Sequence, residues 1–494
     1  MITSRLLLLV LISFAGSHAC RASLTTAVTP VAPAAPQIPA QRSSVADFGG
    51  VPDGETLNTA AFSRALAALA EKGGGTLVVP PGIWLTGPIE LRSHINLHLE
   101  AGALIQFSRD PALYPMRIVD ARGEKSIHTT SPLSGEKLED VAITGAGVID
   151  GGGDVWRVIK KAKVTEGFWK DQIASGGVTS AKGTEWWPSQ AAMDGAAATS
   201  ALNATGALDP AAYEPYRQFL RPRLLHLLDC RRVLIEGVTF RNSPNWTLHP
   251  WICEDLTLRD VKIFNAPWAQ NSDAMDIDSC RRVHVTGCII DTGDDGLCIK
   301  SGKDASGRRL GMPTEDVLIE NCTVYEAHGG FTIGSEMSGG VRNVLVRNCT
   351  FIGTDIGLRF KTARGRGGVV ENIHITGIHM TGIKNAAIDF NFFYAARGKS
   401  AETPPAPDEG TPTFRNILIE DVISRGSDTP LVMRGLPEMP LRDITLHDVS
   451  LSSAHGADLL NCDGIVFERV QIHAAHGEAL TTREVTRSTL PLLP

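Results

Sequence analysis

The sequence predicts a β-helix, a fold in which short strands wind into a stack of coils, and two observations support it. The first is a recurring pattern of one polar residue, then Val, Ile or Leu, then alternating apolar residues. Successive anchors of this pattern are 23 to 34 residues apart, a spacing typical of one coil, and they include Val233, Leu256, Val283, Val317, Val344 and Ile373. The second is composition, since 49 glycines and 6% aromatic residues suit many tight turns better than a large helical core. Helical and propeller repeats fit worse, because each unit is short and interrupted by Asn or Gly.

Four segments within this repeat can be aligned in register: residues 273–279, 295–301, 329–335 and 356–362. In each, apolar residues alternate with polar or small ones, as Met275 and Ile277 do in the first, so each is predicted to be a strand with one buried side. If the four strands stack as consecutive coils, Asp273 lies beside Asp295. Asp294 and His328 are then aligned with each other next to this pair.

The repeat argues for one main domain of residues 43–480, with additions at both ends. Residues 59–72 have helical spacing and end at three glycines, so we expect a helix that caps the first coil. Residues 152–222 break the pattern and hold four of the eight tryptophans, which predicts a large insertion between coils. Residues 395–411 are rich in proline and predict a loop, and residues 481–494 are expected to form a C-terminal tail.

The N-terminus has the pattern of an export signal. Arg5 precedes an apolar run at residues 6–14 that is too short to cross a bilayer, and small residues follow, so residues 1–19 are predicted to be a signal peptide and no transmembrane segment is expected. Secretion or the periplasm is therefore the predicted location. A lipid anchor on Cys20 is the less favoured alternative, because His18 stands where a lipoprotein signal has a small residue. Residues 20–42, rich in Ala and Pro, are expected to form a flexible tether outside the fold.

Charge and cysteine content narrow the class of protein further. The net charge of −7 argues against nucleic acid as a partner, because duplex binding relies on a basic surface. Nine cysteines in an exported chain could pair as disulfides. Several of them recur at a similar point of the repeat, however, and we interpret them as buried thiols stacked inside the coils.

The aligned aspartates predict acid and base chemistry. Three carboxylates on adjacent coils cannot all ionise freely, because like charges raise at least one pKa. One can then stay protonated while another activates water, which is the division of roles that glycoside hydrolysis requires. His328 could stabilise the acid's protonation or orient a sugar hydroxyl. A lone Gly-Asp-Asp would more simply be a turn, but its register with Asp273 and with the cations described next favours a catalytic site.

Cations are predicted on the same face as the aspartates. Arg359 and Lys361 project from the fourth strand, and Lys300 is aligned with Lys361. Such a grouping can be a plain ion-pair network. In an otherwise acidic protein it points to a negatively charged substrate, because Arg is suited to bidentate contact with carboxylates. A polymer of uronic acids fits both the acids and the cations.

These residues resemble the polygalacturonase family, family 28 of the glycoside hydrolases. Four motifs carry the resemblance in order along the chain: Asn271-Ser-Asp273, Gly293-Asp-Asp295, Ala327-His-Gly329 and Arg359-Phe-Lys361. The resemblance implies a right-handed parallel β-helix of the pectin lyase type and an inverting hydrolysis of pectic polysaccharide or oligogalacturonide, with no metal and no other cofactor. It implies that Asp294 is the general acid, that Asp273 and Asp295 activate water, and that His328 supports the acid. Substrate contacts are implied for Arg359 and Lys361, and we add Lys300 and Asn271.

The departures from the family pattern bear on the mode of action. The insertion at residues 152–222 is foreign to compact endo-acting members, and the glycine-rich segments 334–340 and 364–368 look similar to those of bacterial exo-acting members. We therefore expect cleavage of α-1,4-galacturonosyl linkages from chain ends. A rhamnogalacturonan hydrolase, or another hydrolase of pectin side chains, is the main alternative on this fold. A calcium-dependent pectate lyase and a non-catalytic polysaccharide-binding β-helix are less favoured. Trp246, Trp251 and Trp268, and the four tryptophans of the insertion, are candidate sugar platforms.

Overall fold

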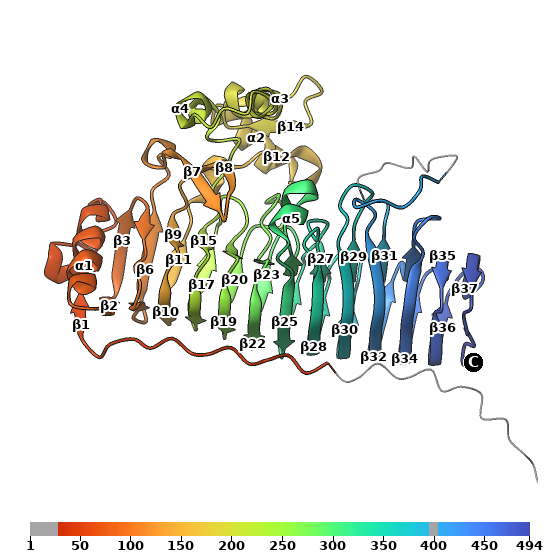
Figure 1. The fold of residues 1–494 in the computed structure, drawn as a ribbon. Coiled ribbons are helices and arrows are strands. Elements are labelled where there is room, and N and C mark those ends of the chain that lie inside the picture. The colour runs from red at the N-terminus through yellow and green to blue at the C-terminus, as the bar shows by residue number, and fades with distance from the viewer. Residues whose placement is uncertain (1–27, 395–403) are drawn as a thin grey trace, which may run out of the picture.

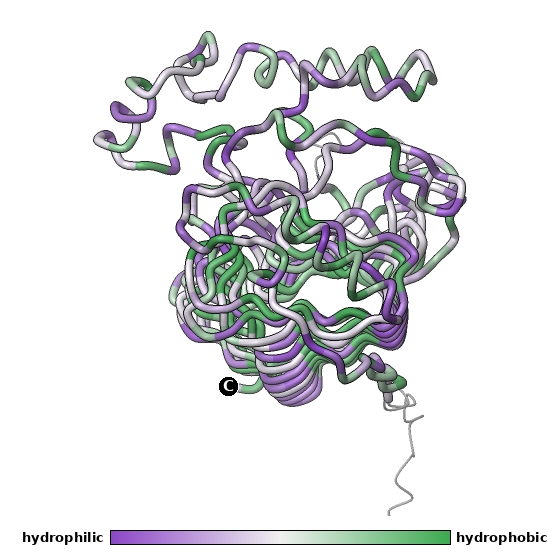
Figure 2. Tube along the Cα trace, turned by 90° about the vertical axis from the view of Figure 1, so that its left-hand side faces the viewer, coloured by the Kyte–Doolittle hydropathy of each residue, from purple (hydrophilic) through white to green (hydrophobic). Residues whose placement is uncertain are grey.

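The computed structural model describes residues 28–394 and 404–494, and these form a parallel β-helix whose coils stack from helix α1 (Thr59–Glu71) to strand β37 (Leu480–Thr486) (Figure 1). Thirty-two strands join into one sheet that winds around the stack. The predicted fold class is therefore confirmed. Figure 2, which looks along the stack, shows the coils superimposed on one another with the insertion as a separate layer above them.

Each coil contributes strands to up to three faces of the stack. The first face consists of β4 (Ile89–Glu90), β9 (Leu133–Glu136), β15 (Leu225–Leu228), β18 (Leu248–Trp251), β21 (Met275–Asp278), β24 (Leu297–Lys300), β27 (Gly329–Ile333), β29 (Ile356–Lys361), β31 (Ala386–Asn391), β33 (Thr429–Arg434), β35 (Ala457–Asp463) and β37. The second consists of β1 (Arg42–Ser44), β2 (Gly75–Val79), β5 (Ile95–Leu99), β10 (Glu139–Gly145), β16 (Arg231–Glu236), β19 (Glu254–Arg259), β22 (Arg281–Thr286), β25 (Thr314–Glu320), β28 (Val341–Ile352), β30 (Val369–Thr381), β32 (Thr413–Ser427), β34 (Leu441–Ser453) and β36 (Val466–Ala474). The third consists of β3 (Gly82–Thr86), β6 (Ala103–Phe107), β11 (Val148–Asp150), β17 (Thr239–Arg241), β20 (Lys262–Phe264), β23 (Ile289–Asp291) and β26 (Thr323–Tyr325), and it continues into the second half of β28.

Apolar columns fill the inside of the stack because every strand places alternate side chains inward. Met275, Leu297, Phe331 and Leu358 occupy one column on the first face and are fully buried. In the next column, the ring of Phe360 stacks on the ring of Phe390 from the following coil, with ring centroids 4.1 Å apart. The eight cysteines among the described residues are all buried and unpaired, which agrees with their interpretation as thiols inside the coils.

The polar residue ahead of each repeat anchor has a left-handed backbone conformation. Positive φ angles of 50° to 58° occur at Asp140, Arg232, Asp255, Arg282, Asp316, Asn343, Asn372, Asn416 and Asp443. Asp and Asn tolerate this conformation better than most residues, which explains why they recur there. Their side chains also bond from coil to coil, as Asn416 Nδ2 does to Asn372 Oδ1 at 2.5 Å.

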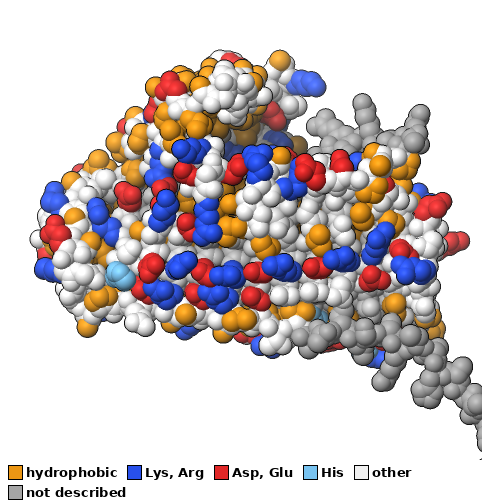
Figure 3. All heavy atoms as spheres, in the orientation of Figure 1, with side chains coloured by type: hydrophobic (Ala, Val, Ile, Leu, Met, Phe, Trp, Pro, Cys, Tyr) orange, Lys and Arg blue, Asp and Glu red, His pale blue; other side chains and the backbone are white. Residues whose placement is uncertain are grey.

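A row of alternating charges lines the second face, visible in Figure 3 as blue and red side chains along the stack. In register, the row reads Glu139, Arg231, Glu254, Arg281, Glu315, Arg342, Glu371 and Arg415. Neighbours pair closely, for example Arg342 with Glu315 at 2.6 Å. Exposed pairs of this kind contribute at most about 1 kcal/mol each, so the row matches charges between coils and the apolar interior supplies most of the stability.

Helix α1 covers the first coil of the stack, and strand β37 belongs to the last coil. Helix α1 buries Phe62, Leu66 and Leu69 against the first coil, as expected for a cap. Strand β37 lies in the segment for which we expected a tail and pairs in parallel with β35, so the stack extends beyond residue 480. The alternation of residues 480–486 is mostly polar because this last coil has one exposed side, and the apolar pattern was therefore too weak to identify it.

Residues 28–41 differ from the expected tether because they lie along the stack (Figure 1). The backbone N–H of Ala34 donates to Asp255 at 3.0 Å, and that of Gln37 donates to Asp140 at 2.9 Å. Both acceptors are the left-handed aspartates of the turns. The predicted signal peptide and Cys20 lie outside the described residues. In the part of the chain that the structure describes, none of the helices combines the length and hydrophobicity needed to cross a membrane.

The segment of residues 152–222 forms a layer over the first face (Figures 1 and 2). It contains α2 (Glu166–Ala174), α3 (Gln190–Ala204), α4 (Pro210–Tyr213) and a small sheet of β12 (Ile159–Lys160), β13 (Val178–Thr179) and β14 (Glu185–Trp187). Two further additions flank the same face: a hairpin of β7 (Met116–Ala121) and β8 (Glu124–Thr129), and helix α5 (Asp304–Leu310).

Candidate active site

The four aligned segments are consecutive strands of the first face. Met275 pairs with Leu297, Leu297 with Phe331, and Phe331 with Leu358, in the register that the sequence predicted. The same register places Asp273 opposite Asp295 just before strands β21 and β24. His328 lies on the coil after Asp294, and its backbone N–H donates to the Asp294 carbonyl at 3.0 Å. The predicted juxtaposition therefore exists in the folded chain.

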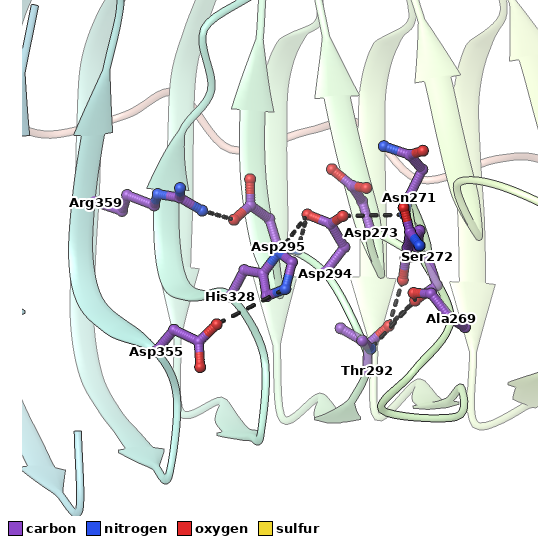
Figure 4. Close-up of polar contacts among 12 residues, drawn as sticks. Ala269, Asn271, Ser272, Asp273, Thr292, Asp294, Asp295, His328, Asp355 and Arg359 are labelled. Atoms are coloured by element: carbon purple, nitrogen blue, oxygen red, sulfur yellow. Dashed lines mark hydrogen bonds and ion pairs between the residues drawn. The ribbon is translucent and has the colours of Figure 1, made fainter. Parts of the chain in front are cut away.

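Three carboxylates gather where these strands begin (Figure 4). One oxygen of each of Asp273, Asp294 and Asp295 lies within 4.8 Å of the others. Asp273 and Asp295 are buried, whereas the side chain of Asp294 keeps 16% of its exposure. Asp294 accepts the backbone N–H groups of Asn271 and Asp295, both at 3.0 Å. Asp294 is thus the member of the cluster that is held in place and still accessible from outside.

The pKa values of the clustered carboxyl groups are pushed apart. Burial, together with Asp276 and Asp294, raises the pKa of Asp273 well above its ordinary value. Burial also acts on Asp295, but Lys361 and Arg359 outweigh it and hold its pKa far below the usual range. Burial is likewise outweighed at Asp294, where the hydrogen bond with His328 keeps the pKa below its ordinary value. Of the three carboxyl groups, Asp273 therefore has the greatest affinity for a proton in the free protein.

His328 connects the cluster to a second acid and to the insertion. Its Nδ1 lies 3.2 Å from Asp294 Oδ1, and its Nε2 lies 3.7 Å from Asp355. The Nζ of Lys163 is 3.1 Å from the same Nε2. Burial lowers the pKa of Lys163. The layer over the first face therefore contributes a cation to the group around Asp294, which the sequence pattern did not indicate.

The predicted cations divide into two sets. Lys361 Nζ lies 2.6 Å and Arg359 Nη1 3.0 Å from Asp295, and both cations lie near the ring of Tyr394. Lys300 is almost fully buried on the other side of the cluster, 3.1 Å from Asp276 and 3.5 Å from Asp273. Its Nζ also stands 3.7 Å from the centre of the Trp246 ring. Lys300 is therefore a buried counter-charge for Asp273 and Asp276.

Asn271 holds the loop ahead of Asp273 in place. Its φ of 53° is left-handed, and its side-chain oxygen accepts a hydrogen bond of 2.9 Å from Arg221. Its backbone, as noted, binds Asp294. The structure thus brings together all eight residues that the sequence singled out, although Asn271 contacts the site through its backbone and Lys300 through Asp273 and Asp276.

Several neighbours of the site were given no role at the sequence level. Asp276 lies in the predicted polar column, and burial raises its pKa to about 7 despite Lys300. Lys163, Arg223 and Tyr394 come from segments without a repeat, so no alignment could place them. Of the insertion's tryptophans, Trp156, Trp169 and Trp186 are buried, which indicates packing for these three.

The acidic cluster could also hold a metal ion, since its oxygens are close enough to share one. Positive charge is already supplied at this position by Lys300, Arg359 and Lys361 within 2.6 to 3.5 Å of the carboxylates. The donor set therefore has an internal counter-charge, and we derive no step through a metal.

Comparison with known proteins identifies the family. The sequence profile of "Glycosyl hydrolases family 28" matches residues 209–473. The chain belongs to this family. It is 30% identical to a probable polygalacturonase of Vitis vinifera over 84% of this chain and 75% of that protein. It is 26% identical to an exo-poly-alpha-D-galacturonosidase of Dickeya chrysanthemi, over 79% of this chain and 64% of that one.

A solved structure agrees with this assignment. The exopolygalacturonase of Thermotoga maritima has a TM-score of 0.74 and 31% sequence identity, and the match covers 92% of this chain and 93% of the other. This family 28 protein is accordingly a glycoside hydrolase of the polygalacturonase type. The lyase and the non-catalytic β-helix, which were the less favoured predictions, belong to other classes.

Proposed function

We propose that this family 28 protein hydrolyses α-1,4-galacturonosyl linkages of pectic polysaccharide or oligogalacturonide by removing units from a chain end. One observation carries the proposal: three carboxylates with separated pKa values share a site with Arg359 and Lys361. The carboxylates suit acid and base catalysis, and the two cations suit the carboxylate of a uronate. Secretion or the periplasm remains the proposed location, because a polysaccharide substrate of this kind lies outside the cell.

In the proposed reaction, Asp294 donates its proton to the glycosidic oxygen as the bond to the anomeric carbon breaks. A water molecule attacks that carbon and loses its proton to Asp273 or Asp295. His328 orients Asp294 through its Nδ1. The sum is one water consumed and one linkage cleaved, with each proton accounted for on a named carboxyl group.

This division of roles requires a proton on Asp294, whereas in the free protein the directions of the pKa shifts favour Asp273 as the proton carrier. Substrate binding supplies the reason for the transfer. A uronate that takes Arg359 and Lys361 leaves Asp295 without its counter-ions and adds a further negative charge, which raises the pKa of neighbouring Asp294. Asp273 then loses the proton to Asp294 within the cluster and becomes the base that activates water.

Inversion of configuration is part of the proposal because the family resemblance implies it. The carboxylate spacing alone does not favour it, since inverting enzymes commonly separate their two carboxyl groups by about 6.5–9.5 Å. Here the nearest oxygens of Asp273, Asp294 and Asp295 lie within 4.8 Å. Proton NMR of the first anomer released from a reduced-end substrate measures the outcome, and retention would refute inversion while leaving the rest of the site intact.

Exo action is supported by a cavity on the opposite side of the cluster from Arg359. It has a volume of about 380 Å³ and is lined by first-face side chains such as His249, Trp251 and Asp278, together with residues of the β7–β8 hairpin and of α5. Glu124 of the hairpin and Arg309 of α5 form a bidentate ion pair at 2.8 Å across this end. A polymer lying along the first face would meet this closure after the terminal sugar.

The same cavity contains groups suited to a terminal uronate. Arg223 is half-buried, and burial lowers the pKa of its guanidinium group to about 10. It donates to His128 at 2.8 Å and lies 5.3 Å from the ring of Trp246, while its Nε has no partner among the described residues. The buried indole N–H of Trp251 likewise has no hydrogen-bond partner among the described residues. A sugar bearing a carboxylate would satisfy both donors.

A timed digest of polygalacturonic acid tests the proposed function. We expect monomeric galacturonate as the main product from the first minutes, because the closed cavity admits one chain end. A ladder of oligomers would refute exo action. Higher activity on rhamnogalacturonan than on polygalacturonic acid would move the assignment to the alternative hydrolase.

A further inference from the structure

A second, larger cavity lies between the insertion and the third face of the stack. Its volume is about 1170 Å³, and its lining comes from α2 and β14 of the insertion on one side and from β17 and β20 on the other. Pockets that hold drug-sized ligands measure about 300–1,000 Å³, so this cavity has room for several sugar rings. None of the three catalytic aspartates lines it.

Aromatic side chains form one part of the wall. Phe168 of α2 packs on Trp268 with ring centroids 5.4 Å apart and planes tilted by 49°. Phe264 of β20 is 43% exposed although it lines the cavity. Phe264 and the half-buried Trp268 thus both place apolar ring surface in the lining, and such surfaces pack against the C–H faces of sugar rings.

The arginines in the wall of the cavity are paired with carboxylates. Arg241 pairs with Asp150 at 3.3 Å, and Arg109 pairs with Asp154, which also accepts a hydrogen bond of 3.3 Å from Asn242. Because both arginines are matched by carboxylates, the lining has no excess charge for a uronate. Paired guanidinium and carboxylate groups present donors and acceptors side by side, as sugar hydroxyls require. Gln172 adds an amide whose contact with Ser175 is a long 3.4 Å.

From this chemistry we infer that the cavity binds a neutral oligosaccharide, separately from the catalytic cleft. Its aromatic wall and matched charges differ from the cleft, where Arg359 and Lys361 provide positive charge for a uronate. The inference does not depend on which uronate polymer is cleaved, because the cavity is built from other residues.

Two segments connect this cavity with the active site. The chain runs from Ile159, which lines the cavity, to Lys163, whose Nζ contacts His328. It also runs from Trp268 in the lining to Asn271, whose backbone binds Asp294. A neutral chain held here would keep a branched polysaccharide beside the cleft and thereby raise the local concentration of cleavable linkages.

Isothermal titration calorimetry of the full chain tests the inference. The probes are three neutral tetrasaccharides, β-1,4-galactotetraose, α-1,5-arabinotetraose and cellotetraose, with tetragalacturonate as the acidic comparison in the Asp294→Asn background. We expect at least one neutral probe to bind with one site per chain. Phe264→Ala should weaken that binding about tenfold, and Lys361→Ala should leave it unchanged.

Tyr325→Ala is the matched control. Tyr325 lies two coils further along the same column as Phe264, is 38% exposed and does not line the cavity. Its removal should not change neutral-sugar binding. The inference is overturned if none of the neutral probes binds, if Tyr325→Ala weakens binding as much as Phe264→Ala, or if Lys361→Ala abolishes it. Exo hydrolysis of polygalacturonic acid would remain measurable in every case, so failure here is distinct from failure of the proposed function.

Discussion

Replacement of Asp294 by Asn tests the assigned proton donor directly. The amide cannot donate a proton to the glycosidic oxygen, and general acid catalysis contributes about 10²- to 10⁴-fold to rate. We therefore expect kcat to fall by that factor, equivalent to about 2.7–5.4 kcal/mol of transition-state stabilisation. Little of this loss should come from unfolding. The amide oxygen can accept one of the two N–H groups, from Asn271 and Asp295, that Asp294 accepts at 3.0 Å, so stability should fall by about 1–2 kcal/mol.

Asp355→Asn provides a matched control for this substitution. Asp355 also contacts His328, at 3.7 Å, but it lies outside the three-carboxylate cluster. Reducing-sugar release from polygalacturonic acid, with unfolding followed by circular dichroism, should separate the two variants by at least tenfold in kcat. The assignment is refuted if folded Asp294→Asn retains activity close to that of the unchanged protein. Equal losses in both variants would place the effect in the orientation of His328 and not in the donated proton.

Three further predictions concern charges around the site. Lys361→Ala removes the cation 2.6 Å from Asp295, so KM should rise about tenfold or more for polygalacturonic acid and less for its neutral methyl ester; equal increases would contradict a carboxylate contact. Lys163→Met removes the insertion's contact with His328 at 3.1 Å, and the acidic limb of the kcat profile should shift while the stack stays folded; an unchanged pH profile would exclude a role for this contact. Burial raises the pKa of Asp278 from 3.8 to about 6, so the folded chain binds this proton more tightly than the unfolded chain. Protonated Asp278 therefore stabilises the fold fully below about pH 4. This contribution is lost as the pH rises through 6, and the free energy of unfolding falls by about 3 kcal/mol. Urea titrations at pH 4 and 7.5 should show that loss, and Asp278→Asn should reduce it.

The repeat made the core of the site predictable. A period of two within strands and a recurring coil length fix which residues are stacked, so the neighbours of Asp273 follow from alignment once the β-helix is assumed. The left-handed turns at Asp140, Asn343 and similar positions reinforce the register, because Asp and Asn mark the same point in successive coils. Local pattern and tertiary position are therefore linked in this part of the chain.

The same logic failed where the repeat stops. Some residues reach the first face from segments that have no counterpart in other coils. Lys163 comes from the insertion and Arg223 from a connecting segment. Glu124 comes from the β7–β8 hairpin and its partner Arg309 from helix α5. Residues 28–41, part of the tether expected at residues 20–42, were not predicted to contact the stack for a related reason. The segment contacts the stack through backbone N–H groups, which donate to Asp140 and Asp255. Because every residue except proline has such a group, these contacts do not require particular residue types.

The amino-acid sequence alone determined the coil architecture, the register of β21, β24, β27 and β29, and the grouping of Asp273, Asp294 and Asp295 with Arg359 and Lys361. These depend on short-range periodicity that is copied from coil to coil. Only the tertiary structure decided in which direction the pKa of each carboxyl group is shifted, that Lys300 is buried against Asp273 and Asp276, and which added elements close and cover the first face. Those properties depend on burial and on distances between segments far apart in the chain, and neither quantity is encoded in a local pattern.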